Sequence, residues 1–410
     1  MNTTDIQNRI ADIPLEQIDV SQPELFQNDT VGMYFKRLRE ESPVHYCPSS
    51  RYGPYWSVTR FDDIMSVDKN HQDFSSQKRG IQIIDFEAGV ERVNFINMDP
   101  PLHDERRKIV TPMVAPTNLA NLQDTIRQRV INILDSLPRN ETFDWVDTVS
   151  IELTTQMLAT LFDFPFEQRR KLTWWSEVGT MDLASGGPID TETKRLAELK
   201  DCLDTFTGLL QERAKKPVKN DLISMMAHSE MINMDAQEFM GTLILLIIGG
   251  NDTTRNSISG GLLALNQHPD EMRKLRANPA LVAQLVPEII RWQTPLTGMR
   301  RTTTRPVKLG GQEIPEGEKV MMWYFSGNRD ESVIPEADRF IIDRARPRHH
   351  LSFGFGIHRC VGNRLAELQL RILWEEILSR DLQIEVVGTP ERTYSNAVRG
   401  FTKMLVRISA

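Results

Sequence analysis

The segment HLSFGFGIHRCVGN, residues 350–363, constrains the fold more than any other part of the chain. It places Cys360, one of only three cysteines, in a glycine-rich turn ahead of a stretch with amphipathic helical periodicity, RLAELQLRILWEEIL. Glycines at positions 354, 356 and 362 permit tight turns and let the backbone approach a flat group closely. A sulfur at a helix N-terminus meets unpaired N–H groups, which favours the thiolate over the thiol.

A lone thiolate narrows the chemistry that this loop can support. No CxxC or HxxH pair accompanies Cys360, so the loop cannot assemble a tetrahedral zinc site. One thiolate is sufficient, however, as the only protein ligand of an iron that four haem nitrogens already hold. The other interpretation is a buried structural cysteine in a glycine-rich turn.

Composition is typical of a globular protein with a sizeable interior, without a nucleic-acid or membrane partner. Of the 410 residues, 40% are hydrophobic and 26% charged, and the net charge of −7 without a Lys/Arg-rich run argues against nucleic acid. The longest apolar run, Leu243–Ile248, is well short of the ~20 residues of a membrane span, and the polar N-terminus does not resemble a signal peptide. Three widely separated cysteines indicate a reducing compartment, so we predict a cytoplasmic protein without a membrane anchor.

The periodicity of apolar residues predicts a mainly α-helical protein with small β-sheets. No repeat, low-complexity tract or linker divides the chain, so we expect a single domain over residues 1–410, with an N-terminal leader of about 40 residues. Alternating apolar residues and turn-forming Gly and Pro predict β-rich parts near 43–61 and 307–324. Pro287 interrupts a helical stretch, where we expect a kink or a late helix start. Helical periodicity covers residues 118–137, 149–161, 189–215, 235–268 and 364–378.

The helix predicted over 235–268 carries a second pattern with chemical meaning, GGNDTT at residues 249–254. Leu246, Gly249 and Thr253 share one helix face because they are three, four and seven residues apart. Two adjacent glycines followed by an Asp–Thr pair are poor helix formers, which favours local opening or a kink. Alone, the pattern is also compatible with an ordinary threonine-rich turn of a core helix.

Together, these two patterns resemble the cytochromes P450. The segment from Phe353 to Gly362 matches the haem-binding loop of that family, Phe-Gly-x-Gly-x-His-x-Cys-x-Gly, and GGNDTT matches its distal-helix motif. The resemblance implies the cytochrome P450 fold, with haem b held between a long distal helix and the cysteine loop–helix. It also implies that Cys360 is the axial iron ligand, that Thr253 holds water and oxygen at the iron, and that Asp252 relays protons.

The same resemblance assigns structural and haem-binding roles along most of the chain. Glu288 and Arg291 of PEIIRW, with Arg339 of EADRF, correspond to a buried structural triad. His103 and Arg107 are four residues apart on one helix face and correspond to partners of the haem propionates. Arg301 and His358 correspond to the two remaining partners of the propionates. The full set of implied haem-binding residues is His103, Arg107, Arg301, Phe353, Gly354, His358, Cys360 and Gly362.

Several runs, among them NFINMDPPLHDERRKIV and KNDLISMMAHSE, resemble one bacterial P450 family that hydroxylates the terminal carbon of medium-chain alkanes and fatty acids. That resemblance implies a monooxygenase that inserts one oxygen atom of O₂ into a terminal C–H bond. A methyl C–H bond is harder to break than a methylene one, so a wide pocket would favour oxidation inside the chain. A narrow channel must reverse this preference, and each tenfold of selectivity for the terminal carbon requires ~1.4 kcal/mol of differential positioning. The residues expected to line this channel are Ile83, Ile84, Phe86, Phe95, Leu246, Gly249, Leu296, Met299 and Phe401.

The charges near the expected channel leave both alkanes and fatty acids as substrates. Residues 81–95 contain Asp85, Glu87 and Glu91 against a single basic residue, Arg92. That segment therefore has no cluster of Arg or Lys to bind an acid head group, although a fatty acid could leave its head group in solvent.

Electrons have to come from another protein, because the chain has neither a CxxC run nor a GxGxxG motif after a strand. We expect a ferredoxin, itself reduced by a ferredoxin reductase, to dock on the cysteine side of the haem of a monomeric enzyme. The basic residues expected to meet an acidic partner are Arg106, Lys108, Arg364 and Arg371.

Three alternatives remain open on the sequence. A peroxygenase would use H₂O₂ without redox partners, and a non-catalytic haem protein would only bind a gas or a ligand. The Asp252–Thr253 pair argues against both, because neither needs a proton relay. A P450 hydroxylase could also act on another hydrophobic substrate, such as a terpene, a sterol side chain or an aromatic compound.

Overall fold

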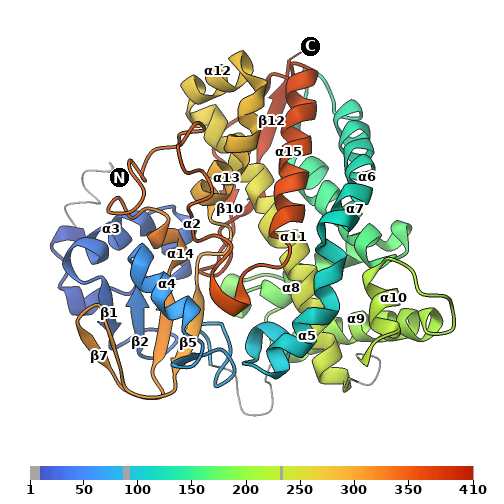
Figure 1. Cartoon of the computed structure of the whole chain (residues 1–410). Helices are drawn as coiled ribbons and strands as arrows, with labels where there is room; N and C mark the ends of the chain where they lie inside the picture. The colour runs from blue at the N-terminus through green and yellow to red at the C-terminus, as the bar shows by residue number, and fades with distance from the viewer. Residues whose placement is uncertain (1–9, 86–92, 231–233, 410) are drawn as a thin grey trace.

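A long helix, α11 (Ala236–Gln267), runs through the centre of the molecule, and other helices pack around it (Figure 1). The computed structural model describes residues 10–85, 93–230 and 234–409. Asp235 caps α11, because its side chain accepts a hydrogen bond from the backbone N–H of Glu238 at 2.9 Å. The expected class, mainly α-helical with small β-sheets, is confirmed. Within the described part of the chain, no helix has the length and apolar character needed to cross a membrane.

The helices that contact α11 come from both halves of the chain. They include α7 (Glu152–Phe162), α8 (Arg170–Thr180), α13 (Val282–Gln293) and α15 (Asn363–Ser379). Helix α15 also packs along a long outer helix, which makes it a bridge between the centre and the periphery. That outer helix is α6 (Pro116–Asp135), and the remaining described α-helices are α2 (Pro23–Gln27), α3 (Val31–Glu41), α4 (Phe61–Lys69), α5 (Leu102–Val110), α9 (Glu192–Arg213), α10 (Leu222–Ala227), α12 (Pro269–Ala277) and α14 (Tyr324–Gly327).

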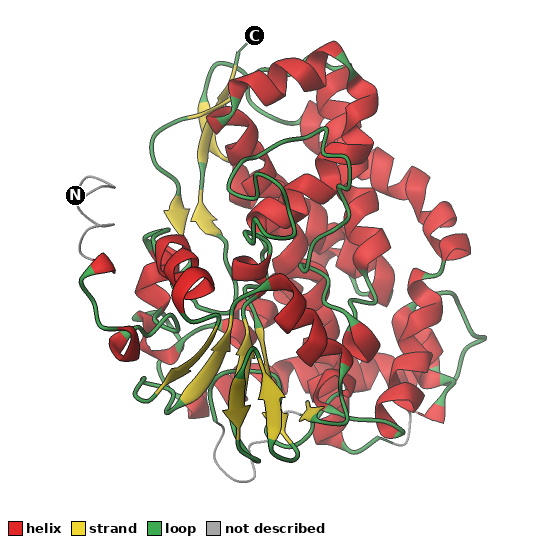
Figure 2. Ribbon diagram, turned by 60° about the vertical axis from the view of Figure 1, so that its left-hand side comes forward, coloured by secondary structure: helices red, strands yellow, loops and turns green. Residues whose placement is uncertain are grey.

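The strands form one five-stranded sheet, with the order β1-β2-β8-β5-β3, and smaller sheets apart from it (Figure 2). Strands β1 (Val44–Cys47) and β2 (Tyr55–Val58) form an antiparallel hairpin inside the first predicted β-rich part. Strand β8 (Lys319–Met322), in the second such part, pairs parallel to β2 and antiparallel to β5 (Met299–Thr303). The other strands are β3 (Phe74–Ser75), β4 (Thr142–Asp144), β6 (Val307–Leu309), β7 (Gln312–Ile314), β9 (Ile384–Val386), β10 (Glu391–Arg392), β11 (Phe401–Lys403) and β12 (Leu405–Ile408).

Strand β5 presents alternate side chains to the two faces of the five-stranded sheet. Met299 and Arg301 point to the face that packs against α4. Arg300 and Thr302 point to the opposite face, where Arg300 lies across from Met321 of β8. The two faces of this sheet therefore carry different sets of charged residues.

Helix α13 begins at Val282 and runs without interruption through Pro287 to Gln293. Of the expected kink or late helix start, the late start is therefore wrong, and the kink stays a prediction. A short 3₁₀ turn, Pro279–Leu281, precedes the helix, so the proline occupies its second turn rather than its first.

Glu288, on α13, lies at the centre of a buried charged network. Its carboxylate accepts hydrogen bonds from Nε and Nη2 of Arg291 at 2.7 and 2.8 Å and from Nε of Arg344 at 3.0 Å. The predicted triad is therefore wrong in its third member, which is Arg344 and not Arg339. The loop bends so that only the carbonyl of Arg339 faces α13, where it accepts from Arg291. The side chain of Arg339 is 67% exposed and pairs with Glu336 at the surface.

Replacement of Arg344 should destabilise the protein far more than replacement of Arg339. We expect Arg344→Ala to lower the free energy of unfolding by on the order of 3 kcal/mol, because the buried carboxylate of Glu288 loses one of its cationic partners. Arg339→Ala, at an exposed position, should change it by less than about 0.5 kcal/mol. Urea unfolding followed by tryptophan fluorescence measures both, and equal losses would contradict the assignment.

Candidate functional site

Cys360 lies in a loop, residues 350–362, that is closed by backbone contacts and packed against α4; we call it the cysteine loop. The backbone N–H of Cys360 donates to the carbonyl of Phe353 at 2.8 Å. Gly356 has a φ of 66°, in the left-handed region. A Cβ at Gly356 would stand 2.5 Å from the carbonyl oxygen of Asp68 on α4, so both conformation and space require glycine there.

Other residues of the cysteine loop are held by short-range contacts. His350 is buried, its Nδ1 accepts from the backbone N–H of Ser352 at 3.2 Å, and its ring lies 5.5 Å from that of Phe353. Gly354 has a φ of 63°, and a Cβ there would lie 3.1 Å from a carboxylate oxygen of α4. At Gly362, in contrast, a Cβ would meet no heavy atom within 4 Å, so this end of the loop borders open space.

The thiol of Cys360 is accessible to solvent, although dense protein surrounds it. This desolvation raises the pKa of Cys360. The backbone N–H groups of Gly362 and Asn363 and the positive charges of Arg107 and Arg359 act in the opposite direction, without reversing the shift. The expected preference for the thiolate is therefore not met by the protein alone, and a bound metal cation is what would ionise this sulfur.

One face of α11 is bare of packed side chains at the middle of the helix. Gly249 is exposed although it belongs to the central helix, and a Cβ there would meet no heavy atom within 4 Å. One turn further on, Thr253 is partly exposed, and its Oγ1 donates to the carbonyl of Gly249 at 2.9 Å. The next residue, Thr254, is buried. At Gly249 and Thr253, this face of α11 therefore borders open space.

Asp252 is turned away from that space and into the contact between α11 and α8. Its Oδ1 lies 3.0 Å from Nη2 of Arg255, and its Oδ2 accepts from the hydroxyl of Thr180 at 3.4 Å. Arg255 in turn donates to Glu177 of α8 at 3.0 Å. The structure thus separates the two predicted catalytic side chains: Thr253 faces the open space, and Asp252 is held by the partly buried Arg255.

Two histidines from distant segments meet with unpaired nitrogens. The rings of His103 and His358 are edge to face, with their centres 4.5 Å apart. His103 Nδ1 lies 2.7 Å from an oxygen of Asp104, and His358 Nε2 lies 3.0 Å from the hydroxyl of Ser76. The other two nitrogens, His103 Nε2 and His358 Nδ1, are buried without a hydrogen-bond partner in the described part of the chain. Burying a polar nitrogen without a hydrogen-bond partner costs free energy, so these two atoms are available to form hydrogen bonds with a bound group.

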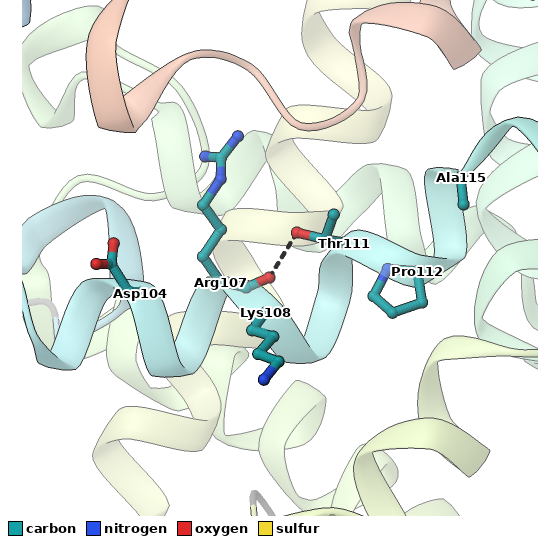
Figure 3. A pocket seen from close by; sticks show the side chains of 6 residues that line it. All are labelled: Asp104, Arg107, Lys108, Thr111, Pro112 and Ala115. Atoms are coloured by element: carbon teal, nitrogen blue, oxygen red, sulfur yellow. Dashed lines mark hydrogen bonds between the residues drawn. The ribbon is translucent and has the colours of Figure 1, made fainter.

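Two arginines predicted to bind haem contact protein groups near these histidines. Nη2 of Arg301 donates to Oδ1 of Asp68 at 2.8 Å, and the hydroxyl of Tyr324 donates to the other oxygen at 3.1 Å. Burial raises the pKa of Asp68, and Arg301 opposes that shift. Arg107 points from α5 toward the cysteine loop, where its Nη2 donates to the carbonyl of Arg359 (Figure 3).

An open hollow of about 630 Å³ lies beside Arg107, along α5 and the turn that follows it (Figure 3). Of the basic residues predicted to receive a redox partner, Lys108 and Arg364 are exposed. Arg106 is paired with Glu238 at 2.6 Å and is therefore neutralised, and Arg371 lies 3.6 Å from a glutamate on its own helix. The hollow is lined by Asp104, Arg107, Lys108, Thr111, Pro112 and Ala115.

The groups described so far fit a haem with two propionates. The cysteine loop offers one solvent-accessible thiol, and the bare face of α11 offers room beside a hydroxyl. The unpaired imidazole nitrogens and the guanidinium groups supply donors for carboxylates. In the part of the chain that the structure describes, no cluster of three or more His, Cys, Asp and Glu could hold a metal ion by itself.

The residues predicted to line the substrate channel are not all in one place. Gly249 and the partly buried Leu246 lie on the same face of α11. Leu296 and Met299 are partly buried beside the five-stranded sheet. Phe86 lies outside the described residues. Three others are buried in hydrophobic cores, namely Ile83, Phe95 and Phe401. Ile84 is exposed at the surface.

Sequence patterns missed two residues that determine the surroundings of Asp252. Arg255 lies three residues after Asp252, so helical spacing alone could have indicated the ion pair. Glu177 lies on α8, and no local pattern connects it to α11. Arg344 was missed for a similar reason, because a bend in the loop decides which of several arginines faces Glu288.

Comparison with known proteins gives a family model that matches just over half of the chain and similar proteins that match nearly all of it. The family model described as Cytochrome P450 matches residues 185–397. Linalool 8-monooxygenase of Pseudomonas putida is 34% identical over 408 residues, which is 96% of this chain and 99% of that protein. Cytochrome P450-153 from Novosphingobium aromaticivorans is 44% identical, with a TM-score of 0.90, and the match covers 95% of this chain and 99% of that one. CYP153D17 from Sphingomonas sp. PAMC 26605 is 47% identical, with a TM-score of 0.90 and coverage of 96% and 99%.

Proposed function

The chain belongs to the cytochrome P450 family, and from that premise we propose that it hydroxylates the terminal carbon of medium-chain alkanes or fatty acids with electrons from a ferredoxin. As a member of the family it has the P450 fold and is a haem b monooxygenase that uses O₂. The substrate proposal is supported by the high similarity to the two P450-153-type structures, together with the sequence runs that resemble terminal hydroxylases. A second candidate substrate is a terpene, which the similarity to linalool 8-monooxygenase favours.

Each element of the site has a role in this proposal. Cys360 would hold the haem iron from the cysteine loop. When bound, haem supplies the reductive activation of O₂, which a thiolate ligand favours by donating electron density to the iron. Phe353, Gly354 and Gly362 would border the haem at the loop. The propionates would be bound by His103, Arg107, Arg301 and His358.

Thr253 and Asp252 have different roles in proton delivery: Thr253 holds a water molecule, and Asp252 supplies the proton. Because the hydroxyl of Thr253 donates to the carbonyl of Gly249, its lone pairs are left to accept a hydrogen bond from water in the open space. Asp252 would reach that water only after its carboxylate turns away from Arg255. Arg255 and the partly exposed Glu177 thus act as positioning residues that hold the acid between proton deliveries.

Thr253→Ala should uncouple electron consumption from product formation. A methyl group cannot hold the water that the hydroxyl holds, so we expect product per NADH to fall roughly tenfold or more while NADH consumption continues. Thr253→Ser keeps the hydroxyl and is the matched control, which should stay coupled. Product and NADH are quantified in the same reaction. Unchanged coupling in the alanine variant would contradict a role of Thr253 in holding that water, and an unchanged enzyme that forms no product with NADH would favour a peroxygenase or a non-catalytic haem protein.

The bare face of α11 gives a physical basis for attack at the end of a chain. No side chain projects from Gly249, so a narrow apolar terminus can approach the haem side of the helix there. Leu246 on the same face, with Leu296 and Met299, would restrict the width of the approach. Such a restriction disfavours broad substrates and brings the terminal methyl group, not a methylene, to the reacting position.

Medium-chain ligands should bind to the purified enzyme and shift its Soret band toward the high-spin position. We expect this shift with decane, octanol and dodecanoate, because an apolar chain that enters the pocket displaces water from the iron site. Turnover should then give mainly terminal alcohols, identified by gas chromatography. If these ligands leave the spectrum unchanged while linalool shifts it, the terpene candidate replaces the medium-chain one.

A ferredoxin would dock where the cysteine loop and the start of α15 approach the surface. Arg364, in the first turn of α15, is exposed, as is Lys108 on α5. An acidic iron–sulfur protein would be attracted to these charges despite the net charge of −7 on the whole chain. A cytoplasmic, monomeric enzyme is also part of this proposal.

Arg364→Glu should weaken turnover that is driven by ferredoxin, and the loss should be largest at low salt, where surface charges are least screened. We expect roughly a tenfold rise in the ferredoxin concentration needed for half-maximal rate. Arg273→Glu, on the exposed side of α12, is the matched control and should leave that concentration unchanged. Equal behaviour of the two variants at every salt concentration would exclude Arg364 from the docking surface.

A further inference from the structure

Arg300, on β5, is a fully buried guanidinium whose hydrogen bonds are incomplete. Its side chain has an exposed fraction of 0%. Nη1 donates to Oδ1 of Asp85 at 2.6 Å and to the carbonyl of Gln82 at 3.5 Å. Nε and Nη2 have no hydrogen-bond partner among the residues that the structure describes. These two N–H groups form the edge that pairs with a carboxylate through two parallel hydrogen bonds, so a complete bidentate donor edge lies buried and unused.

Two neighbours of Arg300 on the same sheet face extend this donor set. Thr302 lies two residues along β5, and its Oγ1 is also buried without a partner in the described ranges. Lys319 of β8 lies opposite Thr302 in the strand register and is 6% exposed. Its Nζ donates to Oδ2 of Asp85 at 2.9 Å and to the carbonyl of Tyr52 at 2.5 Å. Arg300, Thr302, Lys319 and Asp85 are called the Arg300 cluster below.

The Arg300 cluster holds more positive than negative charge. Two buried cations share one carboxylate, that of Asp85, which is itself 47% exposed. Burial lowers the pKa of both Arg300 and Lys319, and the positive charge of Arg79 lowers them further. Buried charge without a full set of counter-charges is costly, so a second anion at this place would be stabilising.

A chain of contacts joins the Arg300 cluster to the distal helix. Lys319 is bonded to the turn between β1 and β2, where Nη2 of Arg51 pairs with Asp182 at 3.0 Å. Asp182 comes two residues after α8, whose last residue, Thr180, donates to Asp252 of α11. The cluster is therefore linked to the loop that follows α8 through the β1–β2 turn, and it lies on the side of the sheet opposite the predicted propionate partner Arg301.

We propose that the unused Nε–Nη2 edge of Arg300, with the Thr302 hydroxyl and Lys319, binds the carboxylate head group of a fatty-acid substrate. This inference rests on the proposed medium-chain function and selects the acid over the alkane. The basic residues that the segment 81–95 lacks are supplied by β5 and β8, which converge on Asp85 of that segment. Asp85 shows that a carboxylate fits these cations, and it acts as their counter-ion when no substrate is bound.

A purely structural role makes a different prediction for the same residues. If the ion pairs only join residues 82–85 to the sheet, any change in the cluster should affect ligands with and without a charge alike. If the cluster recognises a carboxylate, only the charged ligand should respond. The comparison of dodecanoate with 1-dodecanol, which has the same chain length, separates the two roles.

The test is a titration of the haem-containing enzyme with both ligands, followed by the Soret shift and by calorimetry. Arg300→Lys keeps a cation that can reach Asp85 but removes the bidentate edge. We expect it to weaken dodecanoate binding roughly tenfold or more and to leave 1-dodecanol within about twofold. Asp85→Asn removes the competing carboxylate at a half-exposed position, so it should tighten dodecanoate binding several-fold, again without an effect on the alcohol.

Each outcome of this titration either supports or overturns the head-group site. Opposite effects of Arg300→Lys and Asp85→Asn, confined to the acid, support the head-group site. Equal effects on acid and alcohol, or none, overturn it, as does an enzyme that binds dodecane or 1-dodecanol but not dodecanoate; the proposed alkane activity then stands. If the unchanged enzyme binds no medium-chain ligand, the proposed function and this site both fail. If Arg300→Lys does not fold, Thr302→Val removes one donor of the site and should weaken dodecanoate alone.

Discussion

The buried carboxylate of Glu288 is the contact on which the position of the cysteine loop depends. It is neutralised by Arg291 and Arg344, and Arg291 also donates to the carbonyls of Asn328 and Ala337. The side chain of Asn328 then bonds the backbone N–H of Leu351 at 2.6 Å. One charged group thus connects α13 to the start of the loop. Buried ion pairs contribute little net stability, but their geometry is demanding, and here it determines where the sulfur lies.

Neighbouring side chains of the central helix α11 point in different directions, which separates the hydroxyl of Thr253 from the carboxylate of Asp252. Thr253 borders open space, and Asp252 is buried against α8 with Arg255 and Glu177. The acid is thereby kept away from the open space beside Thr253, and the ion pair with Arg255 offsets the cost of its burial. Any displacement of α8 would change this ion-pair network, so the position of α8 is coupled to that of the acid.

Patterns of short range predicted the fold class, the long central helix and the loop around Cys360, because apolar periodicity and glycine spacing are local properties. The same reasoning could not choose between Arg339 and Arg344 as partners of Glu288, because the choice depends on a loop bend. It also found no cation for an acid head group. Arg300 and Lys319 come from two strands that are adjacent only in the folded sheet, so no spacing in the sequence relates them.

The buried imidazole of His350 gives the cysteine loop a sensitivity to acid. Burial, with nearby arginines, lowers its pKa from the usual value of 6.5 to about 3. An unfolded chain would take up a proton at this residue as the pH falls below about 6.5, whereas the folded chain would not until near pH 3. The contribution of this group to stability is therefore complete at neutral pH and decreases on acidification, by up to about 1.4 kcal/mol per pH unit. Mild acid should accordingly loosen the very segment that carries the sulfur.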